Sequence, residues 1–226
     1  MKYIVFGIGR TGSLLLTSIM APDDSGRAHE DKLVGGVING ISMVEPSQER
    51  YDYECQAVGN IVIHTHHLDH LVERLKLDTT EFDLIISDRI NRFEQLMSFF
   101  VAEATAEYNN YTDKQLPPFN IDLNDFTMQY PMQATWPGYY EKPIPEVEWR
   151  AWSWKSKTVI NYEDLISADN MVQYVANRLN LPVPEKYEYD LVHKSPRNYK
   201  DYVLNWKECY NIAQEFDRRL TYDRNF

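Results

Sequence analysis

The first 20 residues constrain the fold of the chain most, because they join a strand, a glycine loop and a helix in that order. The run 2–6 is apolar and rich in strand-forming residues, and glycines stand at positions 7, 9 and 12 before the apolar run 14–20. Glycines allow a tight turn and let backbone N–H groups approach a phosphate at the start of a helix. The segment therefore predicts a phosphate-binding βα unit at the start of an α/β fold.

Strands and helices are predicted to alternate along the rest of the chain. Strands are expected at 60–64, 82–86 and 158–162, a weaker strand pattern covers 33–38, and helices are expected at 68–77, 93–108, 170–179 and 199–220. This alternation predicts one domain over residues 1–226, a three-layer α/β/α fold with a mostly parallel sheet. The proline- and aromatic-rich segment 109–157 is expected to form an irregular cap over the core, with room for a short helix.

The composition excludes several classes of protein. The 226 residues carry a net charge of −11, opposite in sign to that of most nucleic-acid-binding proteins. No apolar run is long enough to span a membrane, and the short apolar start leads directly into the glycine loop, unlike a signal peptide. Cys55 and Cys209 have no metal-binding spacing and are expected to be reduced in a cytoplasmic protein. An anionic ligand must then be held by a local cluster of cations and backbone N–H groups.

Glycines at this spacing occur in more than one kind of nucleotide site. NAD(P) sites share the pattern Gly-x-Gly-x-x-Gly but also need an acidic residue at the end of the second strand, and the run 33–38 is followed by Asn39 and Gly40. The P-loop of nucleoside triphosphatases needs Lys and then Ser or Thr after its last glycine, where this chain has Ser13 and Leu14. An NAD(P)-dependent oxidoreductase stays an alternative on the glycine pattern alone, and an ordinary ATPase or kinase is disfavoured.

The loop resembles that of the sulfotransferases, which use 3′-phosphoadenosine 5′-phosphosulfate (PAPS). Their first loop has Lys or Arg followed by Ser or Thr, then Gly, then Ser or Thr, and the matching residues here are Arg10, Thr11, Gly12 and Ser13. The resemblance implies that these residues, together with Gly9, bind the 5′-phosphate and the sulfonate without a metal. It also implies that Arg10 stabilises charge that develops in the transition state.

A second point of resemblance is His64-Thr65-His66, which directly follows residues 60–63 of the predicted strand. Many sulfotransferases have Lys-Thr-His here, so the resemblance implies that His66 is the general base and that His64 replaces the lysine. An imidazole with a pKa near its ordinary value of about 6.5 can take the proton of a hydroxyl or amine. Two alternatives remain open: a histidine-rich surface loop, and a metal site formed by His66 and His70 at i, i+4 spacing.

Further matches concern the 3′-phosphate and the adenine of the nucleotide. Sulfotransferases hold the 3′-phosphate with an Arg at a strand end and a Ser on the next helix, which implies these roles for Arg89 and Ser98. The two are nine positions apart, one more than in the family. The segment around Tyr162 implies that this ring lies near the adenine, although it would equally fill the core. A basic loop near the C-terminus implies that Arg197 or Lys194 also reaches the 3′-phosphate.

The resemblance covers most of the chain outside the predicted cap, and it implies a P-loop-like fold and a PAPS-dependent sulfotransferase. The acceptor would be a hydroxyl or amine of a small molecule or glycan, and the nucleotide product would be adenosine 3′,5′-bisphosphate (PAP). The alternative is a non-catalytic module with the same fold, which would bind the nucleotide but would not transfer the sulfonate.

Overall fold

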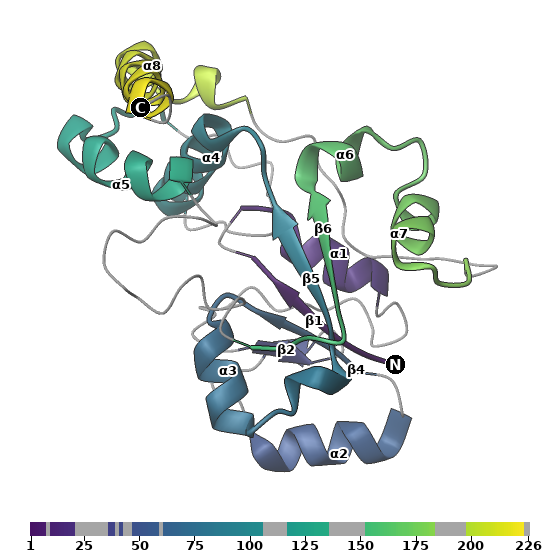
Figure 1. Ribbon diagram of the computed structural model, residues 1–226. Helices are drawn as coiled ribbons and strands as arrows, with labels where there is room; N and C mark the ends of the chain where they lie inside the picture. Colours follow the sequence, from purple (N-terminus) through teal and green to yellow (C-terminus); the bar gives the residue numbers. More distant parts are fainter. Residues whose placement is uncertain are drawn as a thin grey trace. The chain divides into compact units, whose positions relative to one another are not determined.

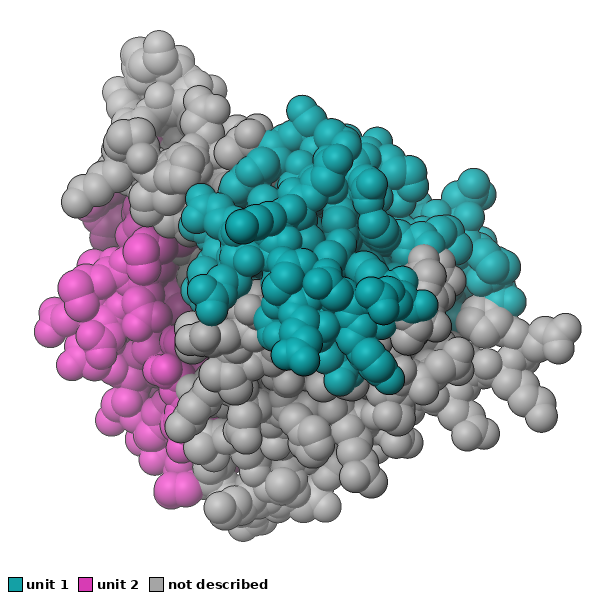
Figure 2. Space-filling view, turned by 90° about the horizontal axis from the view of Figure 1, so that it is seen from below, with its two compact units in different colours: residues 1–90, 148–192 teal, residues 91–147, 193–226 magenta. Residues whose placement is uncertain are grey.

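The computed structural model (Figure 1) describes residues 1–7, 10–20, 36–38, 41–42, 47–58, 61–105, 117–135, 152–183 and 198–223. The chain divides into two compact units, the first of Met1–Ile90 with Glu148–Val192 and the second of Asn91–Val147 with His193–Phe226 (Figure 2). Each unit contains its own core, and each is described by itself. This division does not test the prediction of a single domain over residues 1–226.

In the first unit, the described strands form a six-stranded sheet in the order β3-β2-β4-β1-β5-β6. They are β1 (Lys2–Phe6), β2 (Gly36–Ile38), β3 (Ile41–Ser42), β4 (Ile61–Thr65), β5 (Asp83–Asp88) and β6 (Ser156–Asn161). The four strands β4, β1, β5 and β6 run parallel, whereas β2 pairs antiparallel with β4 and β3 antiparallel with β2. The predicted α/β class and its parallel sheet are confirmed, and the described part of the weaker pattern, residues 36–38, belongs to an antiparallel extension.

Side chains of the three parallel strands β4, β1 and β5 alternate between two buried faces of the sheet. On one face, a strand cluster packs against α1 (Ser13–Met20) and α7 (Met171–Leu179), and its buried members are Tyr3, Val5, Leu15, Leu16, Ile19, Val62, Ile85, Ile160, Leu165 and Val175. The alternate residues Ile4, Ile63 and Leu84 are fully buried on the other face. The helices α2 (Gln48–Val58) and α3 (Leu68–Leu75) lie on that side (Figure 1). Burial of both faces explains the nearly continuous apolar strands of the sequence.

Local signals in the sequence account for both ends of α7 but do not predict every helix of this unit. The Asn170 side chain caps α7 by accepting from Gln173 N at 3.0 Å, and Asn180 ends it in the left-handed region with a φ of 55°. The sequence does not predict α2, whose residues show no apolar stripe. It also extends the last strand to Tyr162, which is instead the first residue of α6 (Tyr162–Ser167).

The second unit is helical in its described part, with α4 (Arg92–Thr105), α5 (Leu123–Thr135) and α8 (Trp206–Asp223). Its buried core is rich in aromatic residues and consists of Phe93, Leu96, Met97, Val101, Ile121, Phe126, Tyr130, Val203, Cys209 and Ala213. The short helix expected within 109–157 is α5, and the helix expected at 199–220 is a 3₁₀ turn at Tyr199–Asp201 followed by α8. The proposed cap over the core stays a prediction. Among the described helices of both units, none is long and apolar enough to cross a membrane.

Candidate functional site

The carboxyl ends of the four parallel strands lie at one edge of the sheet. The residues that follow β1, β4, β5 and β6 are, in that order, Gly7, His66, Arg89 and Tyr162. The strand order reverses at β1, because β4 pairs on one side of it and β5 on the other. Ligands of open α/β sheets bind outside the carboxyl ends of the strands at such a reversal. This edge is therefore the candidate site.

Close contacts require glycine at two positions of the loop. A Cβ atom on Gly7 would lie 2.7 Å from the backbone oxygen of Ser87 and 2.6 Å from Thr11 Oγ1. Gly12 has a φ of 78°, and a Cβ atom there would lie 2.6 Å from Cδ2 of Tyr162. The loop is thus packed tightly against the ends of β5 and β6, which the sequence pattern alone does not show.

Arg10 adopts an unusual backbone conformation within this loop. Its φ of 68° lies in the left-handed region, which costs energy for a residue with a Cβ atom. Strained residues of this kind cluster at sites that bind ligands or carry out chemistry. The Arg10 side chain is half-buried. Gly9 lies outside the described residues, so its expected role stays a prediction.

The loop ends at the start of α1, where an anion would be bound. The N–H of Leu16 donates to Gly12 O at 3.0 Å, which makes Gly12 the residue that caps the helix. Backbone N–H groups in the first turn of a helix have no partner within the helix and attract negative charge. Thr11 and Ser13 flank the cap and are both buried, and Ser87 Oγ donates to Thr11 O at 2.9 Å. The structure thus gathers Thr11, Gly12 and Ser13 at one helix start.

His64 is a buried side chain directly beneath this helix start. It is the fourth residue of β4, its exposed fraction is 1%, and its Nε2 lies 2.8 Å from Ser13 Oγ. Burial lowers the pKa of His64 well below its ordinary value of 6.5, and the neighbouring His66 lowers it further. His64 is therefore neutral at pH 7, unlike the lysine that the sulfotransferases have here.

His66 is oriented by the first residue of the glycine loop. Its Nδ1–H donates to Gly7 O, and its ring meets that of His64 edge to face, with centroids 4.6 Å apart. Burial lowers the pKa of His66 below 6.5, and the hydrogen bond to Gly7 opposes this change. With the proton fixed on Nδ1, the lone pair of Nε2 is available as a proton acceptor. The geometry is that of a general base beside the loop.

The other interpretations of the histidine run can be compared with this geometry. His67 and His70 are exposed, and the backbone N–H of His70 binds the Asp69 carboxylate at 2.7 Å. In the part of the chain that the structure describes, no three His, Cys, Asp or Glu side chains come close enough to hold a metal ion. The interpretation as an exposed surface loop does not account for His66, because its imidazole Nδ1–H donates a hydrogen bond to Gly7 O.

Arg89 lies at the end of β5 against residues of α6. Its guanidinium lies over the Tyr162 ring, 4.7 Å from the ring centroid, and its Nε is 3.7 Å from Glu163 Oε1. The second oxygen of Glu163 accepts from the backbone N–H of Ile90 at 2.9 Å. The Arg89 side chain is 10% exposed and so keeps a small accessible surface. Tyr162 therefore contacts both Gly12 and Arg89, which places it at the site and not in the core of the sheet.

Two of the residues implied by the resemblance cannot be placed in this geometry. Ser98 is a half-buried residue of α4 and belongs to the second unit, so its pairing with Arg89 stays a prediction. Arg197 lies outside the described residues. Conversely, no role for Ser87 or Glu163 was predicted from the sequence. Ser87 directly follows the predicted strand 82–86, and a polar residue at the end of a buried strand was an available signal.

The dinucleotide interpretation depends on the strand beside β1. An NAD site needs a carboxylate at the end of that strand to bind a ribose. The run 33–38 was expected to provide this strand, but the parallel neighbour of β1 is β4. The residues at the end of β4 are Thr65, His66 and His67, so this position offers no carboxylate either.

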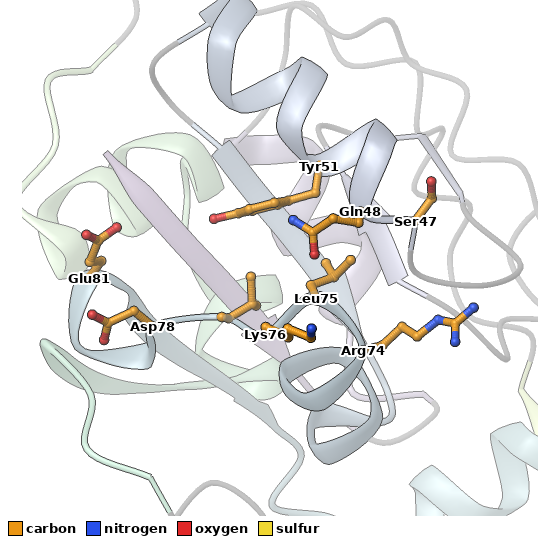
Figure 3. Close-up of a pocket in the computed structure, with 9 residues that line it drawn as sticks. Ser47, Gln48, Tyr51, Arg74, Leu75, Lys76, Asp78 and Glu81 are labelled. Carbon is orange, nitrogen blue, oxygen red and sulfur yellow. The ribbon is translucent and has the colours of Figure 1, made fainter.

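A cavity of about 850 Å³ lies at the opposite edge of the sheet (Figure 3). It is formed by the start of α2, the end of α3 and the segment that leads into β5, and its lining residues are Ser47, Gln48, Tyr51, Arg74, Leu75, Lys76, Leu77, Asp78 and Glu81. Figure 3 shows Asp78 and Glu81 together on one side of the cavity and Arg74 on the other. Because the parallel strands begin at this edge, the cavity is separate from the glycine loop.

Comparison of the chain with protein-family models, with curated proteins and with solved structures gave no significant match.

Proposed function

We propose that the chain is a PAPS-dependent sulfotransferase with a P-loop-like, three-layer α/β/α fold. It would move the sulfonate of PAPS to a hydroxyl or amine of a small molecule or glycan. The observation that carries this proposal is the hydrogen bond from His66 Nδ1–H to Gly7 O. It joins a neutral imidazole to a loop suited to binding an anion, and it leaves Nε2 ready to accept a proton.

In the reaction, the acceptor oxygen or nitrogen attacks the sulfur and loses its proton to His66 Nε2. A bond from sulfur to the acceptor forms, and the bond from sulfur to the 5′-phosphate oxygen breaks, which releases PAP. Negative charge grows on the leaving phosphate, where Arg10 and the first backbone N–H groups of α1 stabilise it. Ser13 adds a hydroxyl at the same helix start. This division of roles needs no lysine after the last glycine and no metal ion.

The other end of the nucleotide would lie against Arg89 and Tyr162. Arg89 is held over the Tyr162 ring, so its planar guanidinium is positioned before any ligand arrives. Tyr162 also contacts Gly12, so the adenine would lie within reach of the same ring. Ser98 and Arg197 are the further contacts to the 3′-phosphate that the resemblance implies. The Glu163 carboxylate near Arg89 Nε competes with that phosphate.

The experiment that tests the nucleotide site is calorimetry without magnesium, using PAP, 5′-AMP, ATP and NAD. We expect PAP to bind at least about tenfold more tightly than 5′-AMP, because charge-assisted hydrogen bonds to the 3′-phosphate are worth about 1.5–3 kcal/mol. Arg89→Ala should remove this preference and leave the affinity for 5′-AMP unchanged. Equal affinities of the wild type for PAP and 5′-AMP would refute the 3′-phosphate site, and tighter binding of NAD would favour the oxidoreductase.

A second measurement separates an enzyme from a binding module. Wild-type chain is incubated with PAPS and a simple phenol or amine as acceptor, and PAP is measured with and without the acceptor. Release of PAP that depends on the acceptor supports sulfonate transfer. Tight binding of PAP without any transfer to a panel of acceptors would favour the non-catalytic module.

A further inference from the structure

The pair formed by His64 and Ser13 is a buried contact between two side chains, one from β4 and one from α1, at the candidate site. Ser13 is the first residue of α1 and is 4% exposed, and His64 is 1% exposed. Their side chains lie 51 positions apart in the sequence, and Ser13 Oγ is 2.8 Å from His64 Nε2. The proposed reaction uses His66 as the base and gives His64 no role.

Two arrangements of protons fit this distance, and burial distinguishes between them. In one, the Ser13 hydroxyl donates to Nε2 and the imidazole proton is on Nδ1. In the other, Nε2–H donates to Ser13 Oγ and Nδ1 carries only a lone pair. Nδ1 is buried and makes no hydrogen bond with the described residues. A buried N–H without a partner is rarer and more costly than a buried acceptor without one, which favours the second arrangement.

We propose that His64 is a positioning residue whose Nε2–H donates to Ser13 Oγ and thereby directs the Ser13 hydroxyl proton to an anionic group bound at the start of α1. A hydroxyl whose oxygen already accepts a hydrogen bond keeps its own proton for another partner. The inference rests on the proposed function in one respect: the anion is the 5′-phosphate of the nucleotide or the sulfonate attached to it.

A neutral donor at this position has a consequence for the charge of the site. Where the sulfotransferases have a lysine, His64 adds no positive charge, because burial keeps its pKa well below 6.5. His66 lies 4.6 Å away, ring centroid to ring centroid, and would repel a charged His64. Recognition of the anion at Ser13 therefore depends on a directed hydroxyl and on the helix start. The attraction of Arg10 adds to both.

The proton position is tested on the full-length chain without ligand. Two-bond ¹H–¹⁵N correlation spectra distinguish the two neutral forms of each imidazole, and His64→Gln identifies the His64 signals. We expect His64 to be neutral at pH 7 with its proton on Nε2. A proton on Nδ1, or a charged His64 at pH 7, would overturn the inference whatever the chain binds.

The role in binding is tested by calorimetry with PAP as the probe. Ser13→Ala should weaken binding about ten- to a hundredfold, as expected for the loss of a hydrogen bond to a charged group. His64→Leu should weaken it about tenfold, whereas His64→Gln, whose amide N–H can still donate to Ser13, should stay within about threefold. In the Ser13→Ala background, His64→Leu should weaken PAP binding almost no further, because the Ser13 hydroxyl that His64 positions is already absent.

A matched control is available on the same helix. Thr17 is buried like Ser13, and its hydroxyl donates to Ser13 O at 2.8 Å. Thr17→Val removes a buried hydroxyl from α1 without touching His64, so PAP should bind as it does to the wild type. Thermal unfolding of every variant shows that it is folded. If His64→Gln binds as poorly as His64→Leu, or if His64→Leu acts equally in the Ser13→Ala background, the positioning role is wrong.

Failure of the proposed function has a different signature. A wild-type chain that does not bind PAP contradicts the nucleotide site and, with it, the direction of Ser13 toward an anion. The spectra of the free chain then still decide whether His64 donates to Ser13.

Discussion

The two edges of the parallel sheet differ in the burial of their polar side chains and in the partners of these side chains. At the carboxyl edge, polar side chains are buried and hold one another in place: His64 with Ser13, Ser87 with Thr11 O, and Arg89 over Tyr162. At the amino edge lies the cavity of about 850 Å³, and the charged residues that line it are exposed. Asp78 caps the turn that follows it by accepting from Thr80 N, and Glu81 pairs with Lys2.

This contrast shows why a cavity by itself is weak support for a binding site. Exposed charged groups around a cavity remain solvated, so they cost no desolvation free energy. Their presence is therefore no sign of a bound ligand. Buried polar groups lose their water and are retained only where the fold or a ligand satisfies them. His64 and His66, whose pKa values burial lowers, lie together at the carboxyl edge and favour it as the functional one. Substitutions at both edges test this contrast.

His66→Ala should have the largest effect on sulfonate transfer, a loss of about two to four powers of ten in turnover. PAP affinity should stay within a few-fold, and His67→Ala and His70→Ala, at exposed neighbours, serve as controls. Because the base must be neutral and the pKa of His66 is lowered, the wild-type rate should be full above pH 6.5 and fall as the pH drops through the lowered pKa. A rate that first rises above pH 7, or an active His66→Ala variant, would contradict this role.

Arg10→Gly should lower turnover by about two to three powers of ten, because a positioned charge donor is lost from the transition state. Glycine adopts the positive φ of Arg10 without strain, so we expect the unfolding free energy to stay within about 1 kcal/mol of the wild type. Urea unfolding and turnover are measured on the same preparation. Unchanged turnover would show that Arg10 does not contact the reacting groups.

Gly12→Ala should lower the unfolding free energy by about 1–3 kcal/mol, the cost of a strained backbone. The new Cβ atom must adopt a φ of 78° and would meet the Tyr162 ring at 2.6 Å. Urea unfolding measures the change, and Tyr162→Ala in the same background should relieve the clash but not the backbone strain. Full stability of Gly12→Ala would mean that the loop is less tightly packed than described here.

Glu163→Gln should tighten PAP binding by a few-fold, because it removes the carboxylate that lies 3.7 Å from Arg89 Nε. The amide oxygen can still accept from the N–H of Ile90, so the turn after β5 should be kept. Binding of 5′-AMP, which lacks the 3′-phosphate, is the control and should not change. Weaker PAP binding would show instead that Glu163 helps to orient Arg89.

Lys76→Asn should change PAP affinity by no more than about twofold, as is usual for a surface substitution away from a site. Lys76 lines the cavity at the amino edge and ends α3 with a φ of 48°, a conformation that asparagine tolerates well. Calorimetry with PAP provides the measurement. A loss of tenfold or more would move the nucleotide site to the amino edge and refute the contrast between the two edges.

Much of the fold could be predicted because its signals are local. The apolar runs and the glycine loop predicted β1, α1, β4 and β5 at nearly their observed positions. The parallel arrangement followed from alternating strands and helices. The pattern failed at α2, where no apolar stripe marks a helix, and at Tyr162, where a strand-forming residue begins α6. Propensity is a weak guide where tertiary contacts decide the backbone state.

The residues alone were enough to predict that a glycine loop joins the first strand to a helix and that a histidine run lies at the end of a buried strand. Both depend on neighbouring residues, whose sterics and periodicity fix local backbone geometry. Folding was needed to make His64 a buried neutral partner of Ser13, to orient His66 by its hydrogen bond to Gly7, and to bring Glu163 beside Arg89. Protonation state and charge pairing are set by burial and by partners from distant segments, and these exist only once the chain has folded.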